Sequence, residues 1–305
     1  MKHTLLIIMS LGLLNLESIS QTKIIFSQSK GPLNSGGTLE LMMHTPKSGI
    51  TKKLLRGSVR GRGEYNVSTS NNGSKIAFTT YRFGGWKLGL GDLRESGIEN
   101  VTKFGKGRRY QYNARFSPDG SKIAYQEYDW GKRRSTLCIA NNEGVYQKEL
   151  VEVSNSDQAF DWTENSEQIV YASAYKDYYN IFIVPVNGGE PTNLIKEERH
   201  TFAVSASRVD SRIAYLSSDK GRISLFTMDL RNRKEIEVTT ELEADRFKQE
   251  GFWAYRTSWS PDGKQIVFNV MIGGNHEVFT VNSDGTNLER ITKNKDTDIA
   301  PYWSN

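Results

Sequence analysis

The sequence predicts an all-β fold: a six-bladed β-propeller of four-stranded antiparallel blades, closed by the C-terminal strand joining the N-terminal blade. Three observations support this prediction: a short apolar motif that recurs six times, a turn signal before it, and complementary chain ends. The motif is one polar residue followed by three apolar ones, and its copies begin at Lys23, Lys75, Lys122, Gln168, Arg212 and Gln265. The steps of 52, 47, 46, 44 and 53 residues are typical of a four-stranded blade with loops of variable length.

A turn signal precedes most copies of the motif. Residues 117–120 and 260–263 both read Ser-Pro-Asp-Gly, in which proline presets φ and Asp-Gly tolerates a tight reversal. A third strand is expected after each motif, as in 181–184 and 277–281, and a short fourth strand after a polar turn, as in 288–292. Short strands at regular spacing, with no long amphipathic run, favour an all-β repeat.

The chain ends predict how the ring closes. The first motif, at residues 23–26, has no first strand before it, whereas residues 300–304 match a first strand with nothing after it. Trp303 and Ser304 align with Trp259 and Ser260. We therefore expect the last strand to complete the first blade, which removes the exposed edges of an open ring.

Residues 116–125 (FSPDGSKIAY), 259–268 (WSPDGKQIVF) and 281–292 (VNSDGTNLERIT) resemble the PD40-type, WD40-like repeats of TolB-type propellers. The resemblance covers about residues 22–305 and implies the propeller fold and a binding role toward a protein partner. Related blades also occur in tricorn-like and prolyl-oligopeptidase-like proteins and in some pectate-type lyases. The chain departs from TolB in showing no α/β domain before the propeller. It also departs in blades two, four and five, where the Pro-Asp-Gly turn is lost.

Composition and the N-terminus set the expected location. Residues 1–20 combine a short basic start with the apolar run 5–14 and small residues at 18–20, which predicts a signal peptide cleaved before Gln21. Residues 21–305 are then a single propeller domain, periplasmic or secreted. A net charge of +5 and a mean hydropathy of −0.56 argue against nucleic-acid binding and membrane insertion. The single cysteine, Cys138, excludes an intramolecular disulfide.

One face of the predicted propeller carries long connections rich in basic and aromatic residues. This loop face holds the loops from fourth to first strands and from second to third strands; the turn face holds the Pro-Asp-Gly turns. Guanidinium groups bind carboxylates, sulfates and phosphates, and aromatic rings offer stacking surface. The candidate ligand-binding residues are Trp86, Arg108, Arg109, Trp130, Arg133, Arg134, Tyr178, Trp253 and Arg256. Residues 241–250 have helical propensity and are expected to form a short helix over the pore.

Arg115 and Asp161 are the candidate channel-lining residues. They occupy equivalent places on neighbouring first strands, where the other blades carry Ser68, Ser205, Ser258 and Tyr302. They are interpreted either as an ion pair between blades, which need not add stability, or as ligand contacts.

The sequence shows no catalytic constellation, so we expect a non-enzymatic, monomeric binding protein with no cofactor and no metal. There is no Gly-x-Ser-x-Gly elbow, and the histidines have no metal-ligand spacing. The favoured function is recognition of a protein or peptide partner in the cell envelope. The alternative is an acidic-polysaccharide-binding protein or a lyase, whose candidate residues are His200, His276, Arg133 and Tyr178.

Overall fold

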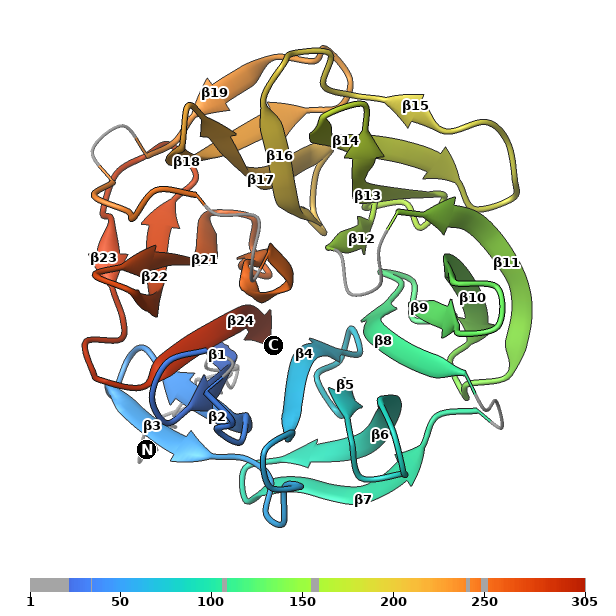
Figure 1. Ribbon diagram of the computed structural model, residues 1–305, viewed down its shortest axis with the longest axis vertical. Coiled ribbons are helices and arrows are strands. Elements are labelled where there is room, and N and C mark those ends of the chain that lie inside the picture. Colours follow the sequence, from blue (N-terminus) through green and yellow to red (C-terminus); the bar gives the residue numbers. More distant parts are fainter. Residues whose placement is uncertain are drawn as a thin grey trace, which may run out of the picture.

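The computed structural model describes residues 22–33, 35–105, 109–154, 159–239, 242–247 and 252–304. They form six four-stranded antiparallel sheets arranged as blades around a ring (Figure 1). The predicted six-bladed all-β propeller is therefore confirmed. Among the described residues, no helix has the length and apolar character needed to cross a membrane. The predicted signal peptide, residues 1–20, lies outside the described residues.

Each blade is given from its innermost to its outermost strand. The strands are, in blade one, β24 (Thr297–Ser304), β1 (Lys23–Ser29), β2 (Glu40–Thr45) and β3 (Ile50–Lys53); in blade two, β4 (Glu64–Thr69), β5 (Lys75–Thr80), β6 (Lys87–Arg94) and β7 (Gly97–Lys103); in blade three, β8 (Tyr110–Phe116), β9 (Lys122–Asp129), β10 (Arg134–Asn141) and β11 (Tyr146–Val153); in blade four, β12 (Phe160–Trp162), β13 (Gln168–Tyr175), β14 (Tyr178–Pro185) and β15 (Thr192–Asn193); in blade five, β16 (His200–Ala206), β17 (Arg212–Asp219), β18 (Arg222–Asp229) and β19 (Glu235–Glu237); and in blade six, β20 (Thr257–Trp259), β21 (Gln265–Ile272), β22 (Asn275–Asn282) and β23 (Glu289–Arg290).

The ring closes as the chain ends predict. β24 pairs with β1 so that Trp303 lies opposite Ile24 and Tyr302 opposite Ile25. The indole of Trp303 packs in an apolar cluster with Ile24, Val267 and other side chains of blades one and six. Closure therefore depends both on strand pairing and on packing against the neighbouring blade.

The strand register confirms which innermost residues are equivalent. Each lies opposite the third residue of its blade's motif, and the pairs are Tyr302 with Ile25, Ser68 with Ala77, Arg115 with Ala124, Asp161 with Val170, Ser205 with Ala214, and Ser258 with Val267. Four of the six innermost strands also contain an irregularity just before this residue. There Asn66, Asn113, Ala203 or Ala300 adopts a positive φ of 52–54°.

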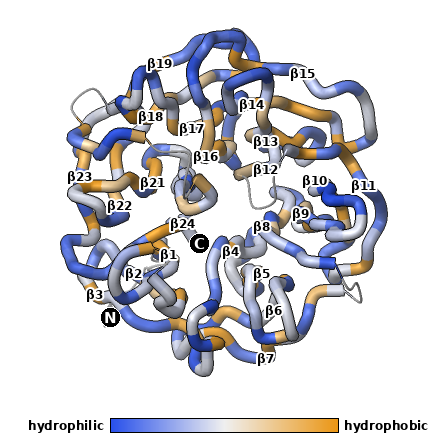
Figure 2. Tube along the Cα trace, in the orientation of Figure 1, coloured by the Kyte–Doolittle hydropathy of each residue, from blue (hydrophilic) through white to orange (hydrophobic). Residues whose placement is uncertain are grey.

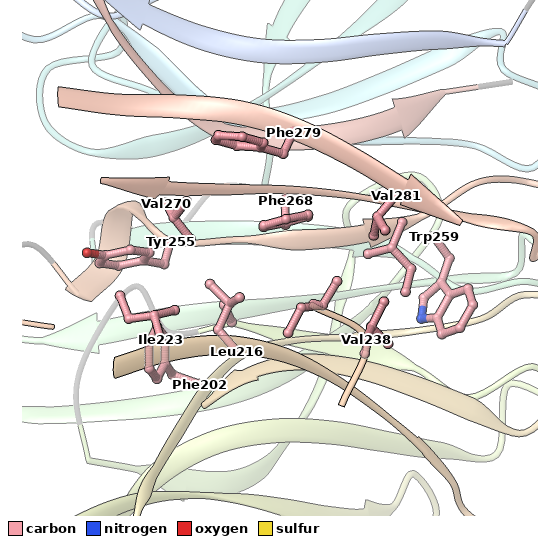
Figure 3. Close-up of a cluster of buried hydrophobic side chains, with 14 residues drawn as sticks. Phe202, Leu216, Ile223, Val238, Tyr255, Trp259, Phe268, Val270, Phe279 and Val281 are labelled. Carbon is pink, nitrogen blue, oxygen red and sulfur yellow. The ribbon is translucent and has the colours of Figure 1, made fainter. Parts of the chain in front are cut away.

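The cores lie between neighbouring blades. The cluster between blades five and six includes Phe202, Leu216, Trp259 and Phe268 (Figure 3). In Figure 2 hydrophobic segments follow the strands, while most peripheral connections are hydrophilic. Alternating burial of this kind is expected for strands that pack against a neighbouring sheet. A rigid stack of blades leaves the connecting loops free to carry binding residues.

Candidate functional site

Residues 252–256, which lead into blade six, lie at the loop-face end of the ring's centre. Their short 3₁₀ helix η1 (Phe252–Ala254) lies, in orange, near the centre of the ring beside β24 and β21 (Figure 1). We call residues 252–256 the plug. Arg256 is buried and donates to the carbonyl oxygens of Trp253 (2.8 Å) and Tyr255 (2.7 Å). It also donates to Oδ1 of Asn113 (3.1 Å) in blade three, so it ties the plug across the ring.

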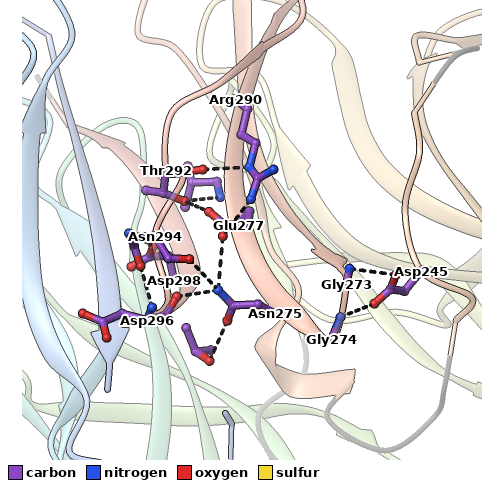
Figure 4. Close-up of polar contacts among 12 residues, drawn as sticks. Asp245, Gly273, Gly274, Asn275, Glu277, Arg290, Thr292, Asn294, Asp296 and Asp298 are labelled. Atoms are coloured by element: carbon purple, nitrogen blue, oxygen red, sulfur yellow. Dashed lines mark hydrogen bonds and ion pairs between the residues drawn. The ribbon is translucent and has the colours of Figure 1, made fainter. Parts of the chain in front are cut away.

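Residues 242–247 are fixed by contacts to the backbone of hairpin loops in blades five and six. The carboxylate of Asp245 accepts hydrogen bonds from the amides of Gly273 (2.9 Å) and Gly274 (2.6 Å), as Figure 4 shows. The amide of Phe247 donates to the carbonyl of Gly221. Residues 242–247 form no helix, so the expected helix over 241–250 is wrong across them; residues 241 and 248–250 lie outside the described residues. The reason is that backbone groups needed for helical hydrogen bonds are used by blades five and six.

Three of the predicted aromatic residues lie in one cluster on the loop face. Trp86 and Trp253 both contact Tyr65 edge-on, with ring centroids 5.2 and 5.5 Å apart. Trp130 contacts Tyr110 and Tyr128 in the same geometry, and Tyr110 contacts Tyr112. Tyr112 packs in the same apolar cluster as Tyr65, which joins the two groups of rings. We call this set the loop-face aromatic cluster; its members are Tyr65, Tyr81, Trp86, Tyr110, Tyr112, Tyr128, Trp130 and Trp253.

A pocket of about 410 Å³ opens at one end of this cluster. Its aromatic wall is Tyr65, Trp86, Tyr112 and Trp253; the remaining lining residues are Ser29, Leu33, Gly36, Gly37, Leu39, Gly61 and Arg62. The walls thus come from blades one, two and three and from the plug. Arg62, which is exposed, lies 5.5 Å from the ring centroid of Tyr81. The arrangement can hold an apolar or aromatic group beside a positive charge.

A buried ion pair positions the loop that carries Arg62. Glu64 is fully buried and accepts from Nε of Arg82 (2.8 Å) and from the hydroxyl of Thr80 (3.2 Å). Ser58 donates to the other carboxylate oxygen. Removing one member would leave a buried charge without its partners, so this network fixes the rim of the pocket.

The predicted basic residues do not form one open patch. Arg109 pairs with Glu127 (2.9 Å), Asp129 (3.1 Å) and Glu149 (3.5 Å), and its hydrogen bond to Glu127 raises its pKa. Arg134 pairs with Glu149 at 2.6 Å. Arg133 is exposed, and Arg108 lies outside the described residues. The charges of Arg109 and Arg134 are therefore used within the molecule, which sequence spacing does not reveal.

Trp130 is the most exposed of the predicted aromatic residues, with 64% of its surface accessible. Tyr178 lies elsewhere on the loop face, beside His200, with ring centroids 5.4 Å apart. Burial lowers the pKa of His200. His276 is deeply buried against Tyr255, and burial lowers its pKa to about 4. The lyase candidates Tyr178 and His200 are thus brought together, whereas His276 is enclosed.

Arg115 and Asp161 lie at equivalent places on the neighbouring innermost strands β8 and β12, near the turn-face end of the ring's centre. The guanidinium of Arg115 lies over the ring of Tyr302, 5.8 Å from its centroid. Both oxygens of Asp161 accept backbone hydrogen bonds, from Trp162 (2.9 Å) and Ala206 (3.1 Å). Burial works to raise the pKa of this carboxyl, against the attraction of Arg115 and Arg208. No three His, Cys, Asp or Glu side chains gather as a possible metal site within the described ranges.

The sequence-based candidates miss Tyr65 and Tyr112, which form much of the pocket wall. The sequence does contain a pattern that marks these two tyrosines. The dipeptide Tyr-Asn occurs at 65–66 and again at 112–113. The separation of 47 residues equals the separation between the motifs of blades two and three. In both strands the asparagine takes the positive φ of the bulge. Asparagine tolerates this conformation better than most residues, so the repeat marks two equivalent bulges that present a tyrosine.

No family model matches the chain. Several solved structures resemble it. TolB from Acinetobacter baumannii superposes with a TM-score of 0.73 and 16% identity, over 92% of this chain and 66% of that one. This chain thus spans slightly less than two thirds of that protein. The putative TolB from Agrobacterium tumefaciens gives 0.66 and 13%, over 93% and 97%.

An enzyme also contains a similar propeller. The puromycin-hydrolyzing peptidase from Mycobacterium tuberculosis superposes with a TM-score of 0.55 and 14% identity, over 87% of this chain and 45% of that one. Identities this low establish architecture, and fold alone does not determine function. The chain therefore has a TolB-like, six-bladed β-propeller fold.

Proposed function

We propose that this protein is a non-enzymatic binding protein that recognises a protein or peptide partner through the loop-face pocket. The observation that carries the proposal is the pocket itself, where four aromatic rings from separate parts of the chain line one concave space beside Arg62. Aromatic residues and arginine dominate the energetics of protein interfaces. The TolB-like fold supports a binding or scaffold role by analogy.

The preferred ligand is an apolar or aromatic side chain next to a carboxylate. The rings of Trp86 and Trp253 meet Tyr65 edge-on, so they are held in place before a ligand arrives. Preorganised aromatic walls lower the entropy cost of binding. The exposed guanidinium of Arg62 can receive a carboxylate at the rim of the pocket.

Selection from a displayed library of random linear peptides, followed by calorimetry with the purified protein, tests the proposal. Selected peptides should carry an aromatic or large apolar residue beside an acidic group. Trp86→Ala and Trp253→Ala should each weaken binding at least about tenfold, which corresponds to about 1.4 kcal/mol. Trp130→Ala tests separately whether the exposed tryptophan contributes to peptide affinity. Ile236→Ala, on β19 away from the pocket, is the control and should leave the affinity unchanged. Equal affinity in wild type and both pocket variants contradicts the proposal.

We also propose that the protein acts outside the cytoplasm after removal of residues 1–20. The support is the basic, apolar and small-residue order of that segment, together with the likeness to TolB. Cell fractionation followed by N-terminal sequencing should give a mature protein beginning at Gln21. Full-length protein in the cytoplasmic fraction would refute export.

Binding or cleavage of an acidic polysaccharide is the alternative function. The contact of Tyr178 with His200 and the exposed ring of Trp130 favour it, whereas the internal pairing of Arg109 and Arg134 weakens it. Absorbance of an unsaturated product from uronate polymers, lost in Tyr178→Phe, would establish a lyase. No absorbance change with any uronate polymer would leave the lyase activity without support.

A further inference from the structure

The loop between β3 and β4, residues 54–63, carries three arginines and no acidic residue. We call it the arginine loop. Its arginines are Arg56, Arg60 and Arg62, and all three are exposed. Arg62 lines the loop-face pocket, and it is the only charged side chain among the described residues of that lining. The loop therefore carries positive charge from the outer strand of blade one to the rim of the pocket.

The three arginines have no carboxylate partner within the part of the chain that the structure describes. The basic residues near them differ in this respect, because Lys53 pairs with Glu40 (2.5 Å) and Arg82 pairs with Glu64 (2.8 Å). Glu64 follows the loop in sequence, but it is buried and offers no carboxylate at the surface. The arginine loop is thus a positive surface without local compensation, which attracts an anionic partner.

Contacts to both neighbouring blades hold the backbone of the arginine loop. The carbonyl of Arg62 accepts the amide of Leu39 (3.2 Å), and the carbonyl of Arg56 accepts the guanidinium of Arg82 (2.5 Å). Gly63 has a φ of 91°, and a Cβ added there would overlap the carbonyl oxygen of Leu39. Only glycine allows this close approach. The loop is therefore positioned before a partner arrives, which lowers the entropy cost of binding.

The pocket and the arginine loop together determine the chemical class of the partner. The pocket wall combines four aromatic rings with the apolar side chains of Leu33 and Leu39, so its occupant needs an apolar side chain. The loop beside it needs several carboxylates, which arginine binds with charge-assisted hydrogen bonds. An acidic peptide segment with an aromatic residue supplies both groups. A uronate polymer supplies carboxylates but no apolar side chain.

We propose that the partner is a protein whose binding segment is a linear acidic peptide, with an aromatic anchor in the loop-face pocket and carboxylates along the arginine loop. This inference rests on the proposed function and specifies the class of peptide. Arg62 binds the carboxylate next to the anchor, and Arg60 and Arg56 attract carboxylates farther along the segment. Charges as exposed as these mainly speed association and set its salt dependence.

Two synthetic peptides that differ only in charge test the inference. The first has one tryptophan between runs of glutamate, and the second has glutamine in place of every glutamate. Calorimetry with the wild-type protein at about 50 mM NaCl should give at least about tenfold higher affinity for the glutamate peptide. At about 500 mM NaCl the difference should largely disappear, because salt screens exposed charges.

Charge reversal in the arginine loop supplies the variant test. Arg60→Glu should weaken binding of the glutamate peptide at least about fivefold and leave the affinity for the glutamine peptide unchanged. The side chain of Arg60 is exposed and makes no hydrogen bond among the described residues, so the fold should be retained. Lys47→Glu, in the exposed turn between β2 and β3, is the matched control. It changes the net charge equally and should leave both affinities unchanged.

The outcomes separate this inference from the proposed function. Equal wild-type affinity for both peptides, lost in Trp86→Ala, would overturn the inference and leave the proposed function intact. An equal loss of glutamate-peptide affinity in Lys47→Glu would reveal a non-specific effect of net charge and refute the inference. Tighter binding of sodium polygalacturonate than of the glutamate peptide, lost in Arg60→Glu, would assign the loop to an acidic glycan instead. No affinity of the wild type for either peptide would contradict both proposals.

Discussion

The two ends of the propeller's centre are built in different ways. At the turn-face end, equivalent positions of the repeat converge, and substitutions at those positions place Arg115, Asp161 and Tyr302 together. At the loop-face end, segments outside the repeat converge, namely the plug and the loops that carry Leu33 and Trp86. The repeat therefore fixes the backbone positions at the turn-face end, and the charge of the side chain at those positions differs from blade to blade. The non-repeating loops form the larger apolar pocket at the loop-face end.

Loss of the closing strand should break both ends at once. Deletion of residues 300–305 removes Tyr302 and Trp303, and it leaves β1 without its inner partner. The open ring exposes unpaired edges, so we expect aggregation or loss of the cooperative thermal transition. Trp303→Ala alone should cost about 3–5 kcal/mol. Size-exclusion chromatography and thermal melting measure both, with deletion of Asn305 alone as the control. A monomeric truncated protein that melts like the wild type would show that the ring closes elsewhere.

Acid should weaken the loop-face end through His276. Its folded-state pKa is about 4, against an ordinary value of 6.5, so between these values the unfolded state binds a proton that the folded state does not. The stability that depends on neutral His276 is complete above pH 6.5 and is lost as the pH falls toward 4. The loss should approach about 3 kcal/mol.

The contribution of His276 is isolated by comparison with His276→Gln. Denaturant unfolding of both proteins from pH 7 to pH 4 gives two stability curves, and their difference should change by the stated amount. Other titrating groups, such as buried Asp298, whose pKa burial raises to about 6, affect both proteins and cancel. Parallel curves would show that His276 is not enclosed as described.

Loosening the plug should weaken the loop-face end of the molecule. Arg256→Met keeps an apolar stem but removes the hydrogen bonds to two carbonyls and to Asn113. The expected destabilisation is about 2 kcal/mol, with peptide binding at the loop-face pocket reduced. Calorimetry and denaturant unfolding measure these effects, with Ile236→Ala on β19 as the control. Unchanged stability together with unchanged peptide affinity would show that these hydrogen bonds do not hold the plug.

The smallest expected effect is a difference in the stability cost of replacing a glycine by alanine on the turn face and on the loop face. Gly120, in the turn of blade three, has φ of 72°, and open space surrounds its missing side chain. Gly120→Ala should cost about 1 kcal/mol from backbone strain alone. Gly131 lies on the loop face without a positive φ, and an added Cβ would lie 3.3 Å from Oδ1 of the Asp129 side chain. Gly131→Ala should therefore cost less than Gly120→Ala. Denaturant midpoints of the two variants test the contrast, and equal midpoints would contradict it.

The blade turns show why the sequence predicted the fold so well. In the Ser-Pro-Asp-Gly turn, Ser117 donates to Asp119 (2.6 Å) and accepts the amide of Lys122. In blade four, Thr163 and Asn165 make the same contacts although proline, aspartate and glycine are all absent. A hydroxyl residue and an Asp or Asn two positions later thus make the same contacts in both turns. The lost Pro-Asp-Gly signal did not mean a lost turn.

The sequence alone determined the all-β class, the six blades, the closure by β24 and the equivalence of Arg115 with Asp161. These features repeat along the chain, so each copy supports the others. Only the tertiary structure decided that Arg109 is neutralised by three carboxylates, that Arg256 is buried in the plug, and that Trp86 and Trp253 meet at Tyr65. These contacts join residues far apart in sequence and outside the repeat. Their geometry depends on how the blades place the loops in space, which local pattern and spacing do not encode.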